Sequence, residues 1–184
     1  MGFDLSDSDK QALLRLARET LAARFENRTP AREEPSQALR AACGAFVTLR
    51  GSDGALRGCI GSISGHGPLH ETVKDMAAAS AFHDPRFEPL AAAELAGLRI
   101  EISVLSPMEP VADPSLVTVG LHGVYIKRGF RSGLLLPQVP GEQGWDRQQF
   151  LTHACYKAGL PAEAWREPGT EIMVFTALVF SEPR

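Results

Sequence analysis

The sequence predicts an α+β protein whose largely antiparallel sheet is built from hairpins and flanked by helices. Two observations predict this class. Residues 43–63 and 124–136 each contain two apolar, alternating segments joined by a glycine-bearing turn, which is the pattern of a β-hairpin. Segments with helical spacing do not alternate regularly with single strands, as a doubly wound α/β fold would require.

The first helix is expected over residues 8–25. Ser8 and Gln11 have the spacing of a capping box, in which each side chain bonds the backbone N–H of the other residue. Leu13 and Leu21 belong to an apolar stripe that recurs at helical spacing. This helix should therefore bury one face against the rest of the domain.

The first hairpin follows, with strands expected over residues 43–50 and 55–63 and a turn over residues 51–54. Alternate side chains of the first strand share one apolar face: Cys43, Ala45, Val47 and Leu49. Because the side-chain period of a strand is two residues, this face should point toward the core.

A second helix should begin near Pro68, as the residue at the first helical position, and end at Asp84, because proline disfavours helix in the residue before it. An alanine-rich segment over residues 89–98 predicts a short helix. Residues 99–105 alternate apolar and polar side chains and predict a half-buried strand.

The second half begins with a proline-rich loop, over residues 107–114, and contains the second hairpin. Asp146 and Gln149 predict the start of the last long helix, and Gly159 predicts its end. Apolar side chains spaced along it form a buried stripe: Phe150, Leu151, Ala154, Cys155 and Ala158. One closing strand is expected over residues 172–180.

Length and charge limit the function classes. The 184 residues suit a single domain, with room for a small subdomain, and a chain of this length needs no disulfide or metal to fold. A formal net charge of −3 argues against a general nucleic-acid-binding protein. There is no apolar run long enough to span a membrane and no signal-peptide pattern, so we expect a cytoplasmic protein with no membrane partner.

The cysteines and histidines predict no metal site. Cys43, Cys59 and Cys155 contain no closely spaced pair, which suits a reducing compartment, and the five histidines lack metal-ligand spacing. Cys43 and Cys155 lie on apolar faces and are expected in the core. The sequence names no cofactor.

The first hairpin carries the candidate site. We place Val47 and Leu49 on the same face of the hairpin as Leu56 and Ile60. This requires that the numbers of two residues paired across the turn add up to an odd number. The opposite face then holds a thiol and two arginines among its members: Phe46, Thr48, Arg50, Arg57, Cys59 and Ile63. Either Thr48 or Phe46 should lie directly across from Cys59.

Two interpretations of Cys59 stay open. Nearby guanidinium groups favour a thiolate or a small anionic ligand, and Gly58 and Gly61 leave room for a ligand or another backbone to approach. On this interpretation Arg57, Arg50 and Thr48 bind the ligand. The alternative is that Cys59 packs as a small apolar side chain and the glycines mark a bulge.

Three residues of the second half are further candidates. His122, at the mouth of a hairpin, is a candidate base toward a thiol, but a histidine bonded to the backbone of a turn is the commoner case. Gln138 and Glu142 lie on a proline-stiffened loop of the kind that often carries function. The other interpretation is that Glu142 stabilises the N-terminus of the following helix.

Six motifs, in order along almost the whole chain, resemble the AMMECR-type domain. They are LRGCIGS (56–62), DPRFEPL (84–90), IEISVLS (100–106), LLPQV (135–139), GWD (144–146) and CYKAGLP (155–161). Prokaryotic members of the family are similar to protein A of the AmmeMemoRadiSam system.

The resemblance implies an α+β fold with a larger and a smaller subdomain. It also implies partners, namely a Memo-like protein and a radical S-adenosylmethionine enzyme. The glycine-flanked cysteine motif is the segment usually proposed as functional in the family, which points to Cys59 with Arg57 as its electrostatic partner. The resemblance implies no reaction. We therefore expect a ligand- or partner-binding component, with a cysteine-dependent enzyme or a redox or modification factor as the alternative.

Overall fold

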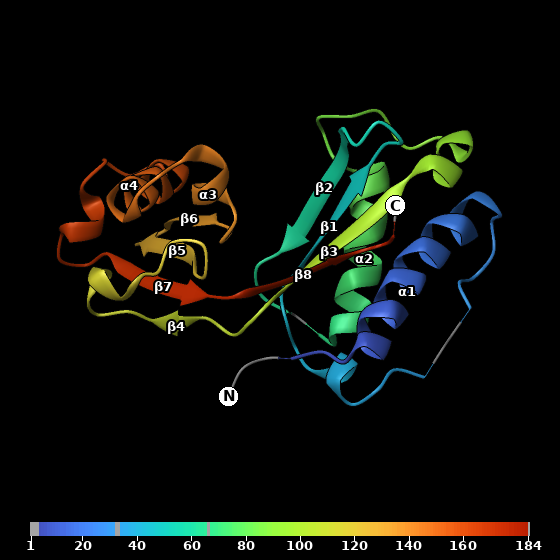
Figure 1. Cartoon of the computed structure of the whole chain (residues 1–184), viewed down its shortest axis with the longest axis horizontal. Helices are drawn as coiled ribbons and strands as arrows, with labels where there is room; N and C mark the ends of the chain where they lie inside the picture. Colours follow the sequence, from blue (N-terminus) through green and yellow to red (C-terminus); the bar gives the residue numbers. More distant parts are fainter. Residues whose placement is uncertain (1–3, 32–33, 66, 184) are drawn as a thin grey trace. The chain divides into compact units, whose positions relative to one another are not determined.

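The structure is a computed structural model that describes residues 4–31, 34–65 and 67–183. The chain forms two compact units (Figure 1). The larger unit comprises Met1–Leu105 and Leu178–Arg184, and the smaller unit comprises Ser106–Ala177. Each unit has its own sheet, and the strand pairs whose register is described are antiparallel. The predicted α+β class is confirmed.

The larger unit packs two long helices against a four-stranded sheet. Its elements are α1 (Asp7–Phe25), β1 (Ala45–Arg50), β2 (Leu56–Ser62), α2 (Leu69–Phe82), β3 (Arg99–Leu105) and β8 (Ala177–Ser181). The strand order is β2-β1-β3-β8, so β2 is an edge strand. Short 3₁₀ turns lie at Ala38–Arg40 and Ala92–Gly97.

Alternate residues of β1 and β3 face the helices. Val47, Leu49, Ile100 and Ile102 are fully buried and share one core with Leu13, Leu21, Leu69 and Val73 of α1 and α2. Cys43 belongs to this core, as expected. The opposite face of the same strands therefore carries Thr48 and its neighbours, because successive side chains of a strand alternate between faces.

The smaller unit packs a helix against a second four-stranded sheet. Its elements are β4 (Glu109–Pro110), β5 (Gly123–Arg128), β6 (Arg131–Leu135), α3 (Val139–Gln143), α4 (Arg147–Lys157) and β7 (Glu171–Phe175), with 3₁₀ turns at Pro114–Leu116 and Ala164–Arg166. The strand order is β4-β7-β5-β6. The predicted stripe of α4 is buried, and Cys155 in it is 0% exposed.

The predicted closing strand is two strands. The chain leaves β7, in the sheet of the smaller unit, at Phe175 and enters β8, in the sheet of the larger unit, at Ala177. Apolar character runs through both segments, so periodicity could not locate a change of sheet.

Four local expectations were wrong. The capping box of α1 uses Ser6 and Asp9 in place of Ser8 and Gln11, and α2 has Pro68 as its N-cap residue in place of its first helical residue. Residues 138–143 are not a loop: Gln138 is the N-cap of α3. The segment 89–98 forms only a 3₁₀ turn. The box of Asp146 and Gln149 at α4 is confirmed.

Candidate functional site

Cys59 lies in the edge strand β2, directly across from Thr48 of β1. Of the two neighbours that the register allowed, the structure selects Thr48. The Thr48 hydroxyl donates a hydrogen bond to the Cys59 sulfur over 3.3 Å. Thr48 is buried, and Cys59 is half-buried. The sulfur is therefore neither sealed in the core nor fully exposed.

The register of the hairpin shifts between Leu49 and Arg50, because a bulge lies opposite them in β2. Leu49 pairs with Gly58, whereas Arg50 pairs with Leu56 and skips Arg57. Leu56 is therefore 38% exposed, and its expected place on the apolar face was wrong. A bulge moves every residue beyond it by one position, so face arithmetic fails past that point.

Asp84 fastens the segment after α2 to β2. One carboxylate oxygen, Oδ2, accepts hydrogen bonds from the Cys59 backbone N–H at 2.8 Å and from Arg86 Nη2 at 2.7 Å. The other, Oδ1, accepts from the backbone N–H and Nε of Arg86 at 3.1 and 2.9 Å. The Asp84 side chain is only 2% exposed, so this network replaces its hydration.

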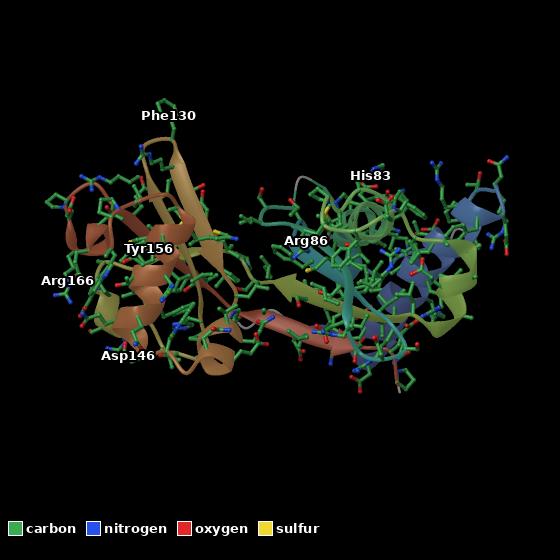
Figure 2. All side chains as sticks on the ribbon, turned by 90° about the horizontal axis from the view of Figure 1, so that it is seen from above. His83, Arg86, Phe130, Asp146, Tyr156 and Arg166 are labelled. Atoms are coloured by element: carbon green, nitrogen blue, oxygen red, sulfur yellow. The ribbon has the colours of Figure 1, made fainter. Side chains whose placement is uncertain are left out.

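Arg86 completes the link on the other side of Cys59. Its Nη2 donates to the Cys59 backbone carbonyl at 3.1 Å, and its side chain is 54% exposed. Figure 2 labels Arg86 among the side chains of the larger unit. The ion pair holds the pKa of Asp84 well below its usual value and raises the pKa of Arg86. A fixed, charged guanidinium group therefore stands beside the cysteine, with Nη1 engaged in no hydrogen bond to the described residues.

Ser80 of α2 makes a second link to the hairpin. Its hydroxyl accepts a hydrogen bond from the Ile60 backbone N–H at 2.9 Å and donates one to the Val47 carbonyl at 2.7 Å. Two successive backbone N–H groups of β2, those of Cys59 and Ile60, are thus bonded to side chains from α2 and from the turn after it. Asp84 thus occupies the backbone donor of Cys59 in the edge strand, which hinders pairing with another chain at this residue.

Arg57, the expected electrostatic partner of Cys59, is paired with a carboxylate. Its guanidinium forms a two-pronged ion pair with Glu94, at 2.6 and 3.1 Å, which raises the pKa of Arg57 and lowers that of Glu94. Arg57 and Arg86 lie 6.0 and 5.5 Å from the ring centre of Phe87, so both guanidinium groups frame that ring. Arg50 donates to the Gly54 carbonyl at 3.5 Å.

The two glycines beside Cys59 make room for the protein itself. A Cβ at Gly58 would lie 2.1 Å from the Ser80 carbonyl oxygen of α2, and one at Gly61 would lie 2.1 Å from the Phe46 ring. The sequence left open whether a ligand or another backbone approaches Gly58. In the structure, the backbone of α2 at Ser80 approaches it.

The other candidates belong to the smaller unit, and each has a local contact. His122 Nδ1 accepts a hydrogen bond from the Thr118 backbone N–H at 3.1 Å, the commoner case for a turn histidine. Glu142 is exposed in the first turn of α3, and the Gln138 carbonyl accepts its backbone N–H at 3.1 Å. The structure thus joins Thr48 to Cys59, while His122, Gln138 and Glu142 lie in another unit.

Sequence reasoning missed Asp84, Arg86 and Ser80 as neighbours of Cys59. The Asp-Pro-Arg run was visible as a helix end, but its attachment to a strand 25 residues earlier depends on tertiary packing. The sequence signal for this attachment is the charged pair, Asp84 and Arg86, on either side of a proline in an otherwise apolar segment.

Among the described residues, Thr48 makes the one recorded hydrogen bond to the Cys59 sulfur, and a threonine hydroxyl is not a general base. No group of three or more metal-binding side chains was found in the described part of the chain. Across residues 4–31, 34–65 and 67–183, no helix is long and apolar enough to cross a bilayer.

Comparison with known proteins gives consistent results. The family model AMMECR1 matches residues 14–180. Protein MK0488 of Methanopyrus kandleri is 43% identical over 191 residues, covering 99% of this chain and 92% of that protein. A protein of Aeropyrum pernix is 44% identical, covering 98% and 83%. The crystal structure of the uncharacterized protein PH0010 from Pyrococcus horikoshii has a TM-score of 0.85 and 38% identity, covering 97% of this chain and 93% of that one.

Proposed function

Because the chain belongs to the AMMECR1 family, we propose that it is a binding component of a three-protein system with a Memo-like protein and a radical S-adenosylmethionine enzyme. The contact surface is the Cys59 surface, which we define as Thr48, Cys59 and Arg86. It receives either one of these partners or a small anionic ligand. The three free cysteines fit a protein of the reducing cytoplasm.

One observation carries the proposal: a nearly buried carboxylate holds an exposed guanidinium group beside a half-exposed thiol. Asp84 makes four hydrogen bonds, and all of them go to Arg86 or to the backbone of Cys59. Burial of a charge is costly unless it is paired, so this network fixes the position of both groups. A charged group that is already in place loses little conformational entropy when it meets a carboxylate or phosphate.

The experiment measures binding of the purified protein to the Memo-like protein and to the radical enzyme of the same genome. We expect Cys59→Ser and Arg86→Gln each to weaken one of these complexes by about tenfold. The matched control is Arg40→Gln, because Arg40 is also an exposed, ion-paired arginine of the larger unit. Circular dichroism must show that each variant is folded. Equal affinities for all four proteins would exclude the Cys59 surface as the interface.

The hydrogen bond from Thr48 to sulfur favours a second candidate, a cysteine-dependent enzyme or a redox or modification factor. If Cys59 is a reactive nucleophile, iodoacetamide should alkylate it faster than it alkylates free glutathione at pH 7. Thr48→Val should reduce that rate. A rate at or below that of glutathione would contradict this second candidate and leave binding as the one proposed function.

A further inference from the structure

The smaller unit contains two adjacent hollows that the proposed function does not use. One has a volume of about 860 Å³ and lies between the chain around β4 and the start of β7. The other has a volume of about 490 Å³ and lies against the first turn of α4. Trp165 and Pro114 line both hollows, so the two adjoin each other at Trp165. Together they define what we call the Trp165 groove.

The floor of the groove is apolar and its rim is polar. Ile172 and Leu151 are buried, whereas Arg166, Glu167 and Pro168 are exposed. Three prolines line the larger hollow: Pro110, Pro114 and Pro168. Figure 2 shows Arg166 at the surface of this unit, and its guanidinium lies 4.3 Å from the ring centre of Trp165. Two adjoining hollows with exposed residues at their edges suit an extended chain better than a compact small molecule.

Two unpaired polar atoms mark the same place. Among the described residues, the buried side-chain nitrogen and oxygen atoms without a hydrogen-bond partner are Trp165 Nε1 and Thr170 Oγ1, and both residues line the larger hollow. Such an atom costs about 1–3 kcal/mol, and native proteins leave few of them. The indole N–H needs an acceptor, and the hydroxyl can donate or accept.

The groove does not favour strand addition. The strand β4 at the edge of the sheet has only two residues, and one of them is Pro110. Proline cannot donate to a ladder and blocks pairing at an edge. A polyproline II segment, in contrast, needs no ladder: it packs its rings against aromatic and proline surfaces and accepts hydrogen bonds at its carbonyl groups.

The charge of the groove adds a preference. Its lining carries four carboxylates and two guanidinium groups: Asp113, Asp146, Glu167 and Glu171 against Arg147 and Arg166. Two charged residues outside the lining do not change this balance. Glu163 pairs with Arg166 and Arg128 pairs with Glu167, so their opposite charges sum to zero. The acidic excess of two favours a peptide with basic residues.

We infer that the Trp165 groove binds a proline-rich segment of a partner protein, in the polyproline II conformation and with a basic residue beside the prolines. This inference goes beyond the proposed function and uses a different unit of the chain. The Trp165 indole N–H and the Thr170 hydroxyl bond peptide carbonyl groups, and the acidic rim binds the basic residue.

The test uses the full chain and a synthetic peptide of about ten prolines with one arginine at each end. Its control is a glycine–serine peptide of equal length with the same arginines. The chain has two tryptophans, so Trp145→Phe leaves Trp165 as the single tryptophan, and Trp165→Phe is the matched control. We expect the proline peptide to shift the emission of Trp145→Phe but not that of Trp165→Phe.

Calorimetry then gives the affinities. Trp165→Phe should weaken binding of the proline peptide about tenfold and Thr170→Val about fivefold, since each removes one hydrogen bond. Removing the arginines of the peptide should weaken binding several-fold, more at low salt. Cys59→Ser should bind the peptide as the natural sequence does, which separates this inference from the proposed function. No binding at millimolar peptide, equal binding of the two peptides, or unchanged affinity in Trp165→Phe would overturn it.

Discussion

The Cys59 surface and the Trp165 groove satisfy their polar groups in opposite ways. Around Cys59, Asp84 and Ser80 each find partners within the protein, and glycine lets a helix approach the strand closely. At the Trp165 groove, two buried polar atoms have no partner and the lining leaves open volume. The first region shows how internal hydrogen bonds fix the positions of polar side chains. The second shows polar atoms whose hydrogen bonds are not formed in the free protein.

The difference between the two regions predicts how the removal of a polar group changes the free energy of unfolding. Polar groups near Cys59 should contribute to the free energy of unfolding, so their removal should cost stability. At the Trp165 groove, removal of an unpaired polar atom should cost little free energy of unfolding or even increase it. Such an atom has no hydrogen-bond partner in the free protein to lose. Four substitutions test this contrast, from the largest expected effect to the smallest.

Asp84→Asn should have the largest effect. It removes the charge from a side chain that is 2% exposed and accepts four hydrogen bonds, so we expect a loss of about 3 kcal/mol in the free energy of unfolding. Urea denaturation measures it. Asp7→Asn is the control: the Asp7 side chain is 98% exposed, and its loss should cost at most about 0.5 kcal/mol.

The pH dependence of the same variant has a defined sign. The pKa of Asp84 is lower in the folded state than in the unfolded chain, so its contribution is present above about pH 4 and is lost as the pH falls toward the folded value. The difference in stability between the natural sequence and Asp84→Asn should therefore shrink below about pH 4. A difference that stays constant down to pH 2 would contradict the ion pair as its cause.

Gly58→Ala should cost about 2 kcal/mol, because its Cβ would lie 2.1 Å from the backbone oxygen of Ser80 and α2 would have to move. Space alone is the reason, since Gly58 has no positive φ. In the smaller unit, Gly141→Ala adds a Cβ with nothing within 4 Å and should be neutral or slightly stabilising. Thermal melts of both variants check the contrast, and equal effects would refute it.

Thr48→Val should cost about 0.5–1 kcal/mol, since it keeps the shape of the side chain and removes the hydroxyl that donates to the Cys59 sulfur. A double-mutant cycle with Cys59→Ala isolates this interaction. Additive effects of the two substitutions would mean that the hydroxyl and the sulfur do not interact.

Thr170→Val should have the smallest effect and the opposite sign. The hydroxyl that it removes is buried and unpaired, so we expect a gain of about 0.5 kcal/mol. The same variant should lose affinity for the proline peptide, so stability and binding should move in opposite directions. A loss of stability as large as that of Thr48→Val would mean that Thr170 has a partner in the free protein.

The parts of this protein that were predictable depend on short-range order. The parity of the first hairpin placed Thr48 or Phe46 across from Cys59, and it holds up to the bulge. The spacing of Asp146 and Gln149 gave the start of α4, and the apolar stripe gave the burial of Cys155. In each case the deciding residues lie within a few positions of one another or on one regular element.

Tertiary structure decided what the sequence alone left open. Arg57 pairs with a carboxylate 37 residues away, and Asp84 holds a backbone N–H 25 residues away. The division of the last strand between two sheets depends on which neighbours each half meets. Long polar side chains have many partners within reach, and an apolar strand can pair in either sheet. Only the packed chain selects among such choices, because burial makes an unpaired charge or backbone group costly.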